Sequence, residues 1–112
     1  MKNVMMINGY QAVVAYDPEL EMFRGEFVGL NGGADFYAKD IDGLKHEGAI
    51  SLKVFLDACT EDGVEPRKSY SGKFVLRLDP KTHEAATAAA IAEGKSLNQW
   101  AAETIRAASM AS

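Results

Sequence analysis

The stretch from Gly72 to Ala108 constrains the fold of this 112-residue chain more than any other part. Residues 73–78 read KFVLRL, in which an apolar side chain at every second position predicts a β-strand with one apolar face. Two helices are predicted to follow it directly. A single strand with two unpaired edges and an apolar face is not stable alone, so it must pair with another strand. The simplest partner is the same strand of a second copy of the chain.

Cap residues mark the ends of both predicted helices. Asp79 is expected to cap the first helix, with Pro80 at its first helical position. Gly94 is expected to end that helix with a left-handed backbone. Ser96 then caps the second helix, and Gln99 stands three residues on, at the spacing of a capping box. These signals predict two helices joined by a tight turn.

The first half of the chain predicts a sheet covered by one long helix, in the order β-β-β-α with a fourth strand left open. Alternating apolar residues predict the strands, which are expected at residues 4–16, 21–30 and 34–38. An apolar stripe predicts a helix over residues 40–60, with Asp40 as its cap. Residues 64–70 are interpreted as a short edge strand or a linker. The boundary between the halves is expected near residues 68–71.

Charge is divided unevenly between the two halves. Residues 1–70 carry 7 basic and 12 acidic side chains, a net charge of −5, whereas residues 71–112 carry 5 and 4, a net charge of +1. An acidic chain is a poor candidate for nucleic-acid binding as a whole, but the asymmetry allows a local basic face in the second half. The single cysteine, Cys59, cannot form an internal disulfide, which indicates a reducing cytosol.

The sequence predicts no membrane span and no signal peptide. No apolar run approaches the roughly 18 residues that a transmembrane helix requires. The first residues lack a long apolar core before a cleavage site. A cytoplasmic location is therefore expected.

Acidic residues are numerous in the first half, but they do not predict a catalytic site. Asp17 and Glu19 lie in a predicted hairpin turn, where Asp is favoured for backbone reasons. A metal-dependent nuclease would need several carboxylates to converge on two metal ions. His46 and His83 lie on different predicted helices, and one cysteine gives no zinc-ligand spacing. No catalytic residue, metal ligand or cofactor is predicted.

The segment RLDPKTHEAATAAAIAEGKSLNQWAAETI, which begins at Arg77, resembles the C-terminal half of HicB-type antitoxins. Its strand-helix-helix order resembles the ribbon-helix-helix DNA-binding motif of the Arc/MetJ kind. The segment YQAVVAYDPELEMFRGEFVGL, which begins at Tyr10, resembles the N-terminal half of the same family, a partial RNase H-like fold. The resemblance implies an α+β protein with a toxin-binding domain at residues 1–68 and a dimerising DNA-binding domain at residues 69–112.

The resemblance also implies which residues would contact DNA. In a ribbon-helix-helix dimer two antiparallel strands lie in the major groove, and the base-facing residues here would be Lys73, Val75 and Arg77. A phosphate would be held by backbone N–H groups at the start of the second helix, near Ser96, Leu97 and Asn98. The inward apolar residues expected to form the dimer core are Phe74, Leu76, Leu78, Ile91, Leu97, Trp100 and Ile105.

The implied function is that of an antitoxin rather than an enzyme, because the RNase H-like half of this family is regarded as lacking nuclease activity. The acidic half would block a small, basic, RNA-cleaving toxin of the HicA kind. The other half would repress its own operon by binding operator DNA as a dimer, and a tetramer formed through the N-terminal halves is left open.

Two other functions stay open from the residues alone. One is a stand-alone transcriptional regulator whose first half is a sensor or an oligomerisation domain. The other is a metal-dependent nuclease that uses Asp17 and neighbouring acids. A neighbouring gene for a small basic protein would separate the antitoxin from the stand-alone regulator. Metal-dependent RNA cleavage would favour the nuclease.

Overall fold

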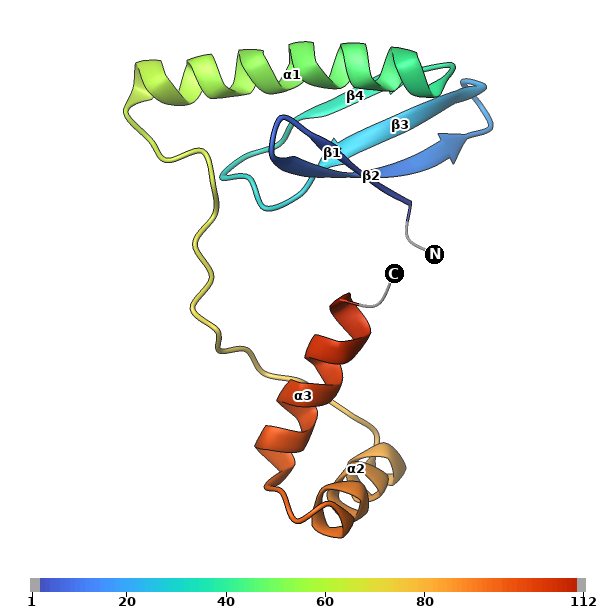
Figure 1. Ribbon diagram of the computed structural model, residues 1–112, viewed down its shortest axis with the longest axis vertical. Coiled ribbons are helices and arrows are strands. Elements are labelled where there is room, and N and C mark those ends of the chain that lie inside the picture. The colour runs from blue at the N-terminus through green and yellow to red at the C-terminus, as the bar shows by residue number, and fades with distance from the viewer. Residues whose placement is uncertain (1–2, 111–112) are drawn as a thin grey trace. The chain divides into compact units, whose positions relative to one another are not determined.

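An antiparallel sheet in the order β1-β2-β3-β4 forms the centre of the first half of the chain (Figure 1). Its strands are β1 (Val4–Ile7), β2 (Tyr10–Asp17), β3 (Met22–Phe27) and β4 (Asp35–Ala38). The helix that follows them is α1 (Ile41–Asp62), and the second half contributes α2 (Pro80–Ala92) and α3 (Leu97–Met110). The computed structural model describes residues 3–110, and over these residues the chain is an α+β protein with four strands and three helices.

The chain divides into two compact units, Met1–Ser71 and Gly72–Ser112. Residues 1–2 and 111–112, at the outer ends of the two predicted domains, lie outside the described residues. Each unit buries its own apolar side chains. The most deeply buried large residues of the first unit are Leu44 and Leu52. The buried residues described in the second unit are two alanines of α2, Ala86 and Ala90.

Two strands replace the single strand that the sequence predicted at residues 4–16. Asn8 and Gly9 both have positive φ, 48° and 85°, which is the backbone of a two-residue hairpin turn. β1 therefore turns back and pairs along β2 in antiparallel register. An Asn-Gly pair favours such a turn, but apolar residues continue on both sides of it and concealed the break. The fourth strand thus comes from within the first predicted range and not from residues after the helix.

The other elements of the first unit follow the prediction. β3 and β4 lie inside the ranges predicted at residues 21–30 and 34–38. α1 begins after Asp40, whose carboxylate accepts a hydrogen bond from the Gly43 N–H at 2.6 Å, as expected of an N-cap. It ends at Gly63, where a φ of 67° supplies the left-handed cap.

The segment after α1 is partly fixed to the sheet. A β-bridge joins Arg67 to Leu30. The Arg67 guanidinium lies 3.9 Å from the centroid of the Tyr10 ring, which is a cation–π contact. It also donates a hydrogen bond to the Gly9 carbonyl at 3.1 Å. Residues 64–70 therefore combine the two predicted roles, because the part around Arg67 pairs with the first unit and the remainder leads to the second.

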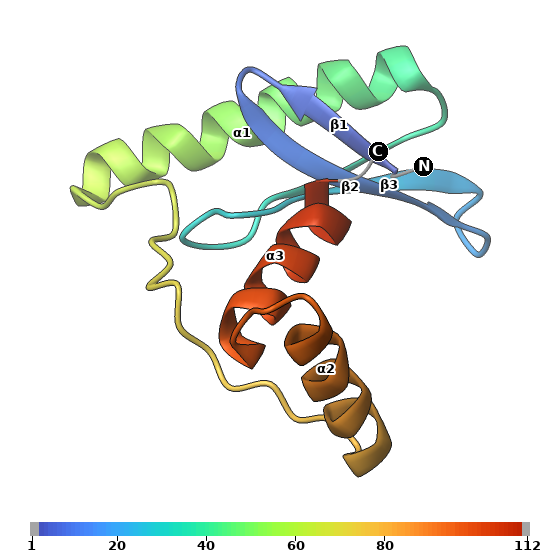
Figure 2. The same ribbon diagram turned by 60° about the horizontal axis from the view of Figure 1, so that its bottom comes forward.

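α1 lies across one face of the sheet, and two glycines make this close packing feasible (Figures 1 and 2). A Cβ atom at Gly48 of α1 would lie 2.3 Å from Cδ1 of Ile7 in β1. A Cβ atom at Gly25 of β3 would lie 2.2 Å from the ring of Phe36, which is 4% exposed. The core around these contacts consists of Ile7, Ala12, Phe27, Leu30, Phe36, Ala38, Leu44 and Leu52. An RNase H-like identity for this unit stays a prediction.

Substitution of Gly25 tests this packing. We expect Gly25→Ala to lower the free energy of unfolding by about 1–3 kcal/mol, because three atoms of the buried Phe36 ring would lie within 3 Å of the new methyl group. The matched control is Gly33→Ala, since no heavy atom lies within 4 Å of a Cβ there. We expect that variant to stay within about 0.5 kcal/mol of the unaltered chain in urea denaturation. Equal stability of the two variants would contradict the packing argument.

Candidate nucleic-acid interface

Residues 73–78, which were predicted to form a strand, belong to no strand in the described part of the chain. All of their side chains are exposed, and Val75 is exposed by 87%. The physical reason is that β-structure requires hydrogen bonds to a second backbone, and one chain supplies only one such segment. The predicted strand is therefore absent from the single chain.

The alternation in this segment still decides which side chains meet the helices. Phe74, Leu76 and Leu78 line an apolar groove of about 970 Å³ within the second unit, whereas residues 73, 75 and 77 do not. The other side chains that line the groove come from α2 and α3 and include Thr82, Ala86, Ala89, Leu97, Trp100 and Ile105. The groove is thus formed by one face of residues 73–78 and the two helices.

Six of the seven residues predicted for the dimer core line this groove. The exception is Ile91, which is 72% exposed and lines a separate shallow hollow on α2 with Pro80 and Thr87. Its place in a dimer core stays a prediction, as does the dimer itself. The alanines of α2 differ in their surroundings. Ala86 and Ala90 are buried, whereas Ala88 lines the hollow beside Ile91.

Asp79 fixes the junction between residues 73–78 and α2. Its carboxylate accepts hydrogen bonds from the Thr82 hydroxyl at 2.6 Å and from the Thr82 N–H at 3.2 Å. These bonds hold the pKa of Asp79 below its ordinary value. Pro80 is the first residue of α2. Both predicted helix-start signals are confirmed.

The N-terminus of α3 is also capped as predicted. The Ser96 hydroxyl accepts a hydrogen bond from the Gln99 N–H at 3.1 Å. Gly94, just before it, has a φ of 68°, the left-handed backbone expected at the end of α2. Ser96 and Asn98 are exposed, and Leu97 is half-buried because it lines the groove. Phosphate binding at this helix end stays a prediction.

A polar network that the sequence did not predict fixes the turn between α2 and α3. The Lys95 ammonium group pairs with the carboxylates of Glu93 and Glu103. Glu93 also accepts a hydrogen bond from the Trp100 indole N–H at 2.8 Å, which orients that ring. The Glu103 and Glu93 carboxylates raise the pKa of Lys95, and Lys95 lowers the pKa of Glu103. Lys95 lies in the turn and Glu103 lies in α3, so no helix-face spacing revealed the pair.

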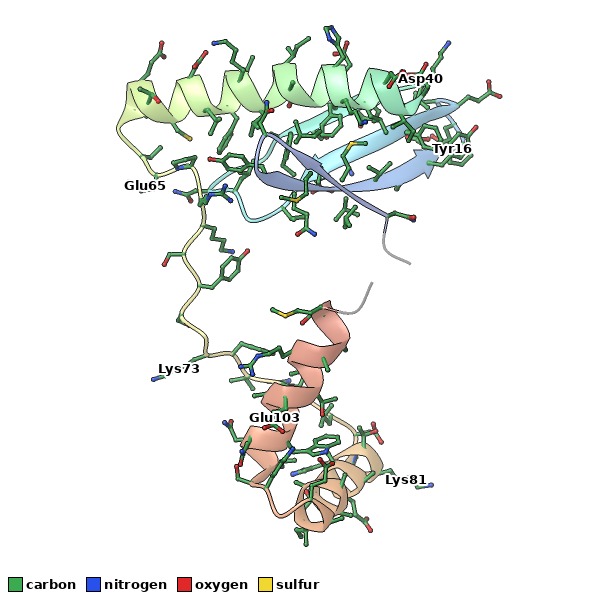
Figure 3. The ribbon with its side chains drawn as sticks, in the orientation of Figure 1. Tyr16, Asp40, Glu65, Lys73, Lys81 and Glu103 are labelled. Atoms are coloured by element: carbon green, nitrogen blue, oxygen red, sulfur yellow. The ribbon has the colours of Figure 1, made fainter. Side chains whose placement is uncertain are left out.

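Basic residues are frequent in the sequence where residues 73–78 meet α2. Lys73, Arg77 and Lys81 occur within nine residues, with Asp79 as the one acidic residue among them. Figure 3 shows the side chains of Lys73 and Lys81 extended away from the ribbon. The local positive charge of this segment is of the kind that attracts phosphates.

The acidic turn of the first unit shows a structural role. The Asp17 carboxylate accepts hydrogen bonds from the backbone N–H groups of Glu19 at 3.0 Å and Leu20 at 3.3 Å, which confirms the turn interpretation. Between residues 3 and 110, no group of three or more His, Cys, Asp or Glu side chains is placed to hold a metal ion. None of the helices described in that range combines the length and the hydropathy that a membrane crossing needs.

The Lys95 network makes stability depend on pH. Because the pKa of Glu103 is lower in the folded chain, its contribution is present above the ordinary carboxyl value of 4.5 and is lost as the pH falls through the folded pKa. We therefore expect Glu103→Gln to lower the melting temperature at pH 7 and to have little effect near pH 3. Thermal denaturation monitored by circular dichroism would measure this.

The control for that experiment is Glu84→Gln on α2, because Glu84 makes no ion pair in the described part of the chain. We expect its melting temperature to follow the unaltered chain at both pH values. A Glu103→Gln effect of equal size at both pH values would mean that the ion pair with Lys95 is not the cause.

One family model matches this region of the chain. Residues 55–105 match the model of the HicB family. The matched range begins within α1 and ends within α3, so it contains residues 73–78 and the capped starts of both α2 and α3. No curated protein and no solved structure matched the chain. The family match supports a HicB-type protein.

Proposed function

We propose that this chain is the antitoxin of a toxin–antitoxin pair. Its second unit, within the predicted domain at residues 69–112, dimerises and binds the operator DNA of its own operon. Its first unit, within the predicted domain at residues 1–68, binds and blocks a small RNA-cleaving toxin of the HicA kind. The observation that carries the proposal is the groove lined by alternate residues of segment 73–78, in a region that matches the HicB family. The proposed role is binding and repression in the cytoplasm, not catalysis.

The dimer is argued from exposed apolar side chains. Phe74 is 73% exposed, and Leu76 and Leu78 are also exposed although they line the groove. A second copy whose residues 73–78 pair antiparallel with the first would give both backbones their hydrogen bonds and would close the groove. Complete burial of one such side chain contributes roughly 1.5–3 kcal/mol, and each copy supplies three of them. A ribbon-helix-helix dimer satisfies these requirements.

In that dimer the other face of the paired segments is left for DNA. Lys73, Val75 and Arg77 alternate with the groove-lining residues and would therefore point away from the dimer core. Lys and Arg side chains suit the O6 and N7 acceptors of guanine in the major groove, and Val75 can pack on a thymine methyl group. The N–H groups at the start of α3, and separately Lys81 at the start of α2, would contact phosphates.

The first unit is suited to a partner of opposite charge. Its residues up to 70 carry a net charge of −5. Such a surface repels DNA and accelerates association with a basic protein. The division of charge therefore supports two separate binding roles in one chain.

Two substitutions at neighbouring positions test the dimer. We expect Leu76→Asp to shift the chain to monomer in sedimentation equilibrium, because it places a charge in the closed groove. Val75→Asp makes a similar change on the opposite face and should leave the dimer intact. Dimers of unchanged strength in Leu76→Asp, or loss of dimers in Val75→Asp, would exclude the proposed pairing.

Arg77→Ala tests DNA recognition. We expect it to weaken binding to a duplex from the region upstream of its own coding sequence by about fivefold or more, since one arginine–guanine pair is worth about 1–3 kcal/mol. Fluorescence anisotropy across a salt series should show affinity of the unaltered chain falling steeply with salt, because phosphate contacts release counterions. Arg106→Ala on α3 is the matched control and should retain affinity. Salt-independent binding would contradict the ribbon interpretation.

A further inference from the structure

The sheet face opposite α1 is not covered by any element of the first unit between residues 3 and 71. Its side chains alternate with those of the core. Val13 lies between the buried Ala12 and the half-buried Val14, and Tyr37 lies between the buried Phe36 and Ala38. The exposed large apolar residues of this face are Val4, Met6, Val13, Val28 and Tyr37. This face is called the open face below.

The strand register shows that these residues share one surface. Val4 pairs with Val13, Val13 with Glu26, and Glu26 with Asp35, so a single row crosses all four strands. Cross-strand partners project from the same side of a sheet. Val4 and Val13 therefore lie at the β1–β2 side of this row, and the carboxylates of Glu26 and Asp35 lie at its β3–β4 side.

An arginine holds both carboxylates in place. Arg24 of β3 donates to Oδ2 of Asp35 from Nε at 3.2 Å and from Nη2 at 2.9 Å, and it donates to Oε2 of Glu26 at 3.2 Å. The pKa of Arg24 is raised, chiefly by its hydrogen bond to Asp35, so the guanidinium stays charged. Oδ1 of Asp35 and Oε1 of Glu26 accept no hydrogen bond from the described residues. Two fixed acceptors therefore face solvent next to apolar side chains.

The charge of this surface decides which occupant it favours. Asp17, Glu26 and Asp35 share the open face with Arg24, and the turn between β2 and β3 adds Glu19 and Glu21. Acidic side chains therefore outnumber basic ones on and beside this face. Two copies of the open face would bring like charges together, which disfavours self-association through it. A basic protein surface would instead match both the free carboxylate oxygens and the apolar strip.

We propose that the open face is the docking surface for a small basic protein that presents Lys or Arg beside apolar residues, a proposal that rests on the antitoxin function above. Such a basic surface is also what a protein uses to grip RNA phosphates. Docking on the open face therefore covers the partner's RNA-binding surface and blocks its access to RNA. Glu26 and Asp35 serve as anchors for the partner's cations, and Met6 and Val13 supply the apolar contact.

The test uses the full chain and the small basic protein encoded by the adjacent gene, with affinity measured by isothermal titration calorimetry. Glu26→Lys and Met6→Asp on the open face should each weaken binding at least tenfold. The matched controls are Glu47→Lys and Val54→Asp on the exposed side of α1, which should bind like the unaltered chain. Met6 and Val54 are both 65% exposed, so the apolar pair is also matched in accessibility. Melting temperatures verify that each variant is folded.

The outcomes separate the docking surface from the function on which it rests. If the unaltered chain does not bind the adjacent gene product, the proposed antitoxin function fails. If the unaltered chain binds and the folded open-face variants bind equally well, only the docking surface is wrong. Loss of binding confined to Glu47→Lys and Val54→Asp would move the surface to α1. If Met6→Asp has a lower mass in sedimentation than the unaltered chain, both measured without the partner, the open face is a contact between copies. That result would also overturn the proposal.

Discussion

Among residues 3–110, segment 73–78 pairs with no strand, and the need of a β-strand for a second backbone is the constraint around which the second unit is arranged. The segment is exposed, yet its alternate side chains already line a groove with α2 and α3. An exposed apolar strand of this kind is an aggregation hazard unless a specific partner covers it. In the proposed dimer, pairing with a second copy would remove the hazard and create a two-stranded surface at once.

The helices that complete the groove are held by short-range polar contacts. Asp79 fixes the start of α2, and Ser96 fixes the start of α3. Lys95 then joins the turn to α3 through Glu103, while Glu93 orients the Trp100 ring. The groove therefore has a defined shape before any second copy arrives, which reduces the ordering that dimerisation would require.

The first unit solves a different problem, because one helix can cover only one face of a four-stranded sheet. Gly25 and Gly48 permit close packing of that face, and the core forms there. The opposite face keeps a mixed apolar and acidic surface organised by Arg24. The two units thus differ in charge, with a net charge of −5 up to residue 70 and +1 after it.

The sequence by itself determined the features that depend on groups a few residues apart. These are the caps at Asp40, Asp79 and Ser96, the left-handed glycines at the helix ends, and the alternation that separates groove-lining from outward residues in segment 73–78. Local hydrogen bonds and side-chain periodicity need no knowledge of the rest of the chain. The helix starts and six groove-lining residues were therefore predictable, whereas their roles in dimerisation and DNA binding stay predictions.

Only the tertiary structure decided the features that join distant parts of the chain. These features are the antiparallel pairing of β1 with β2, the hydrogen bond from Arg67 to the β1–β2 turn, and the ion pair of Lys95 with Glu103. No rule of sequence spacing predicts them, because each depends on how the backbone folds. The open face likewise follows from which side of the sheet α1 covers. That choice rests on packing among Ile7, Phe36 and Gly48, residues whose proximity exists only after folding.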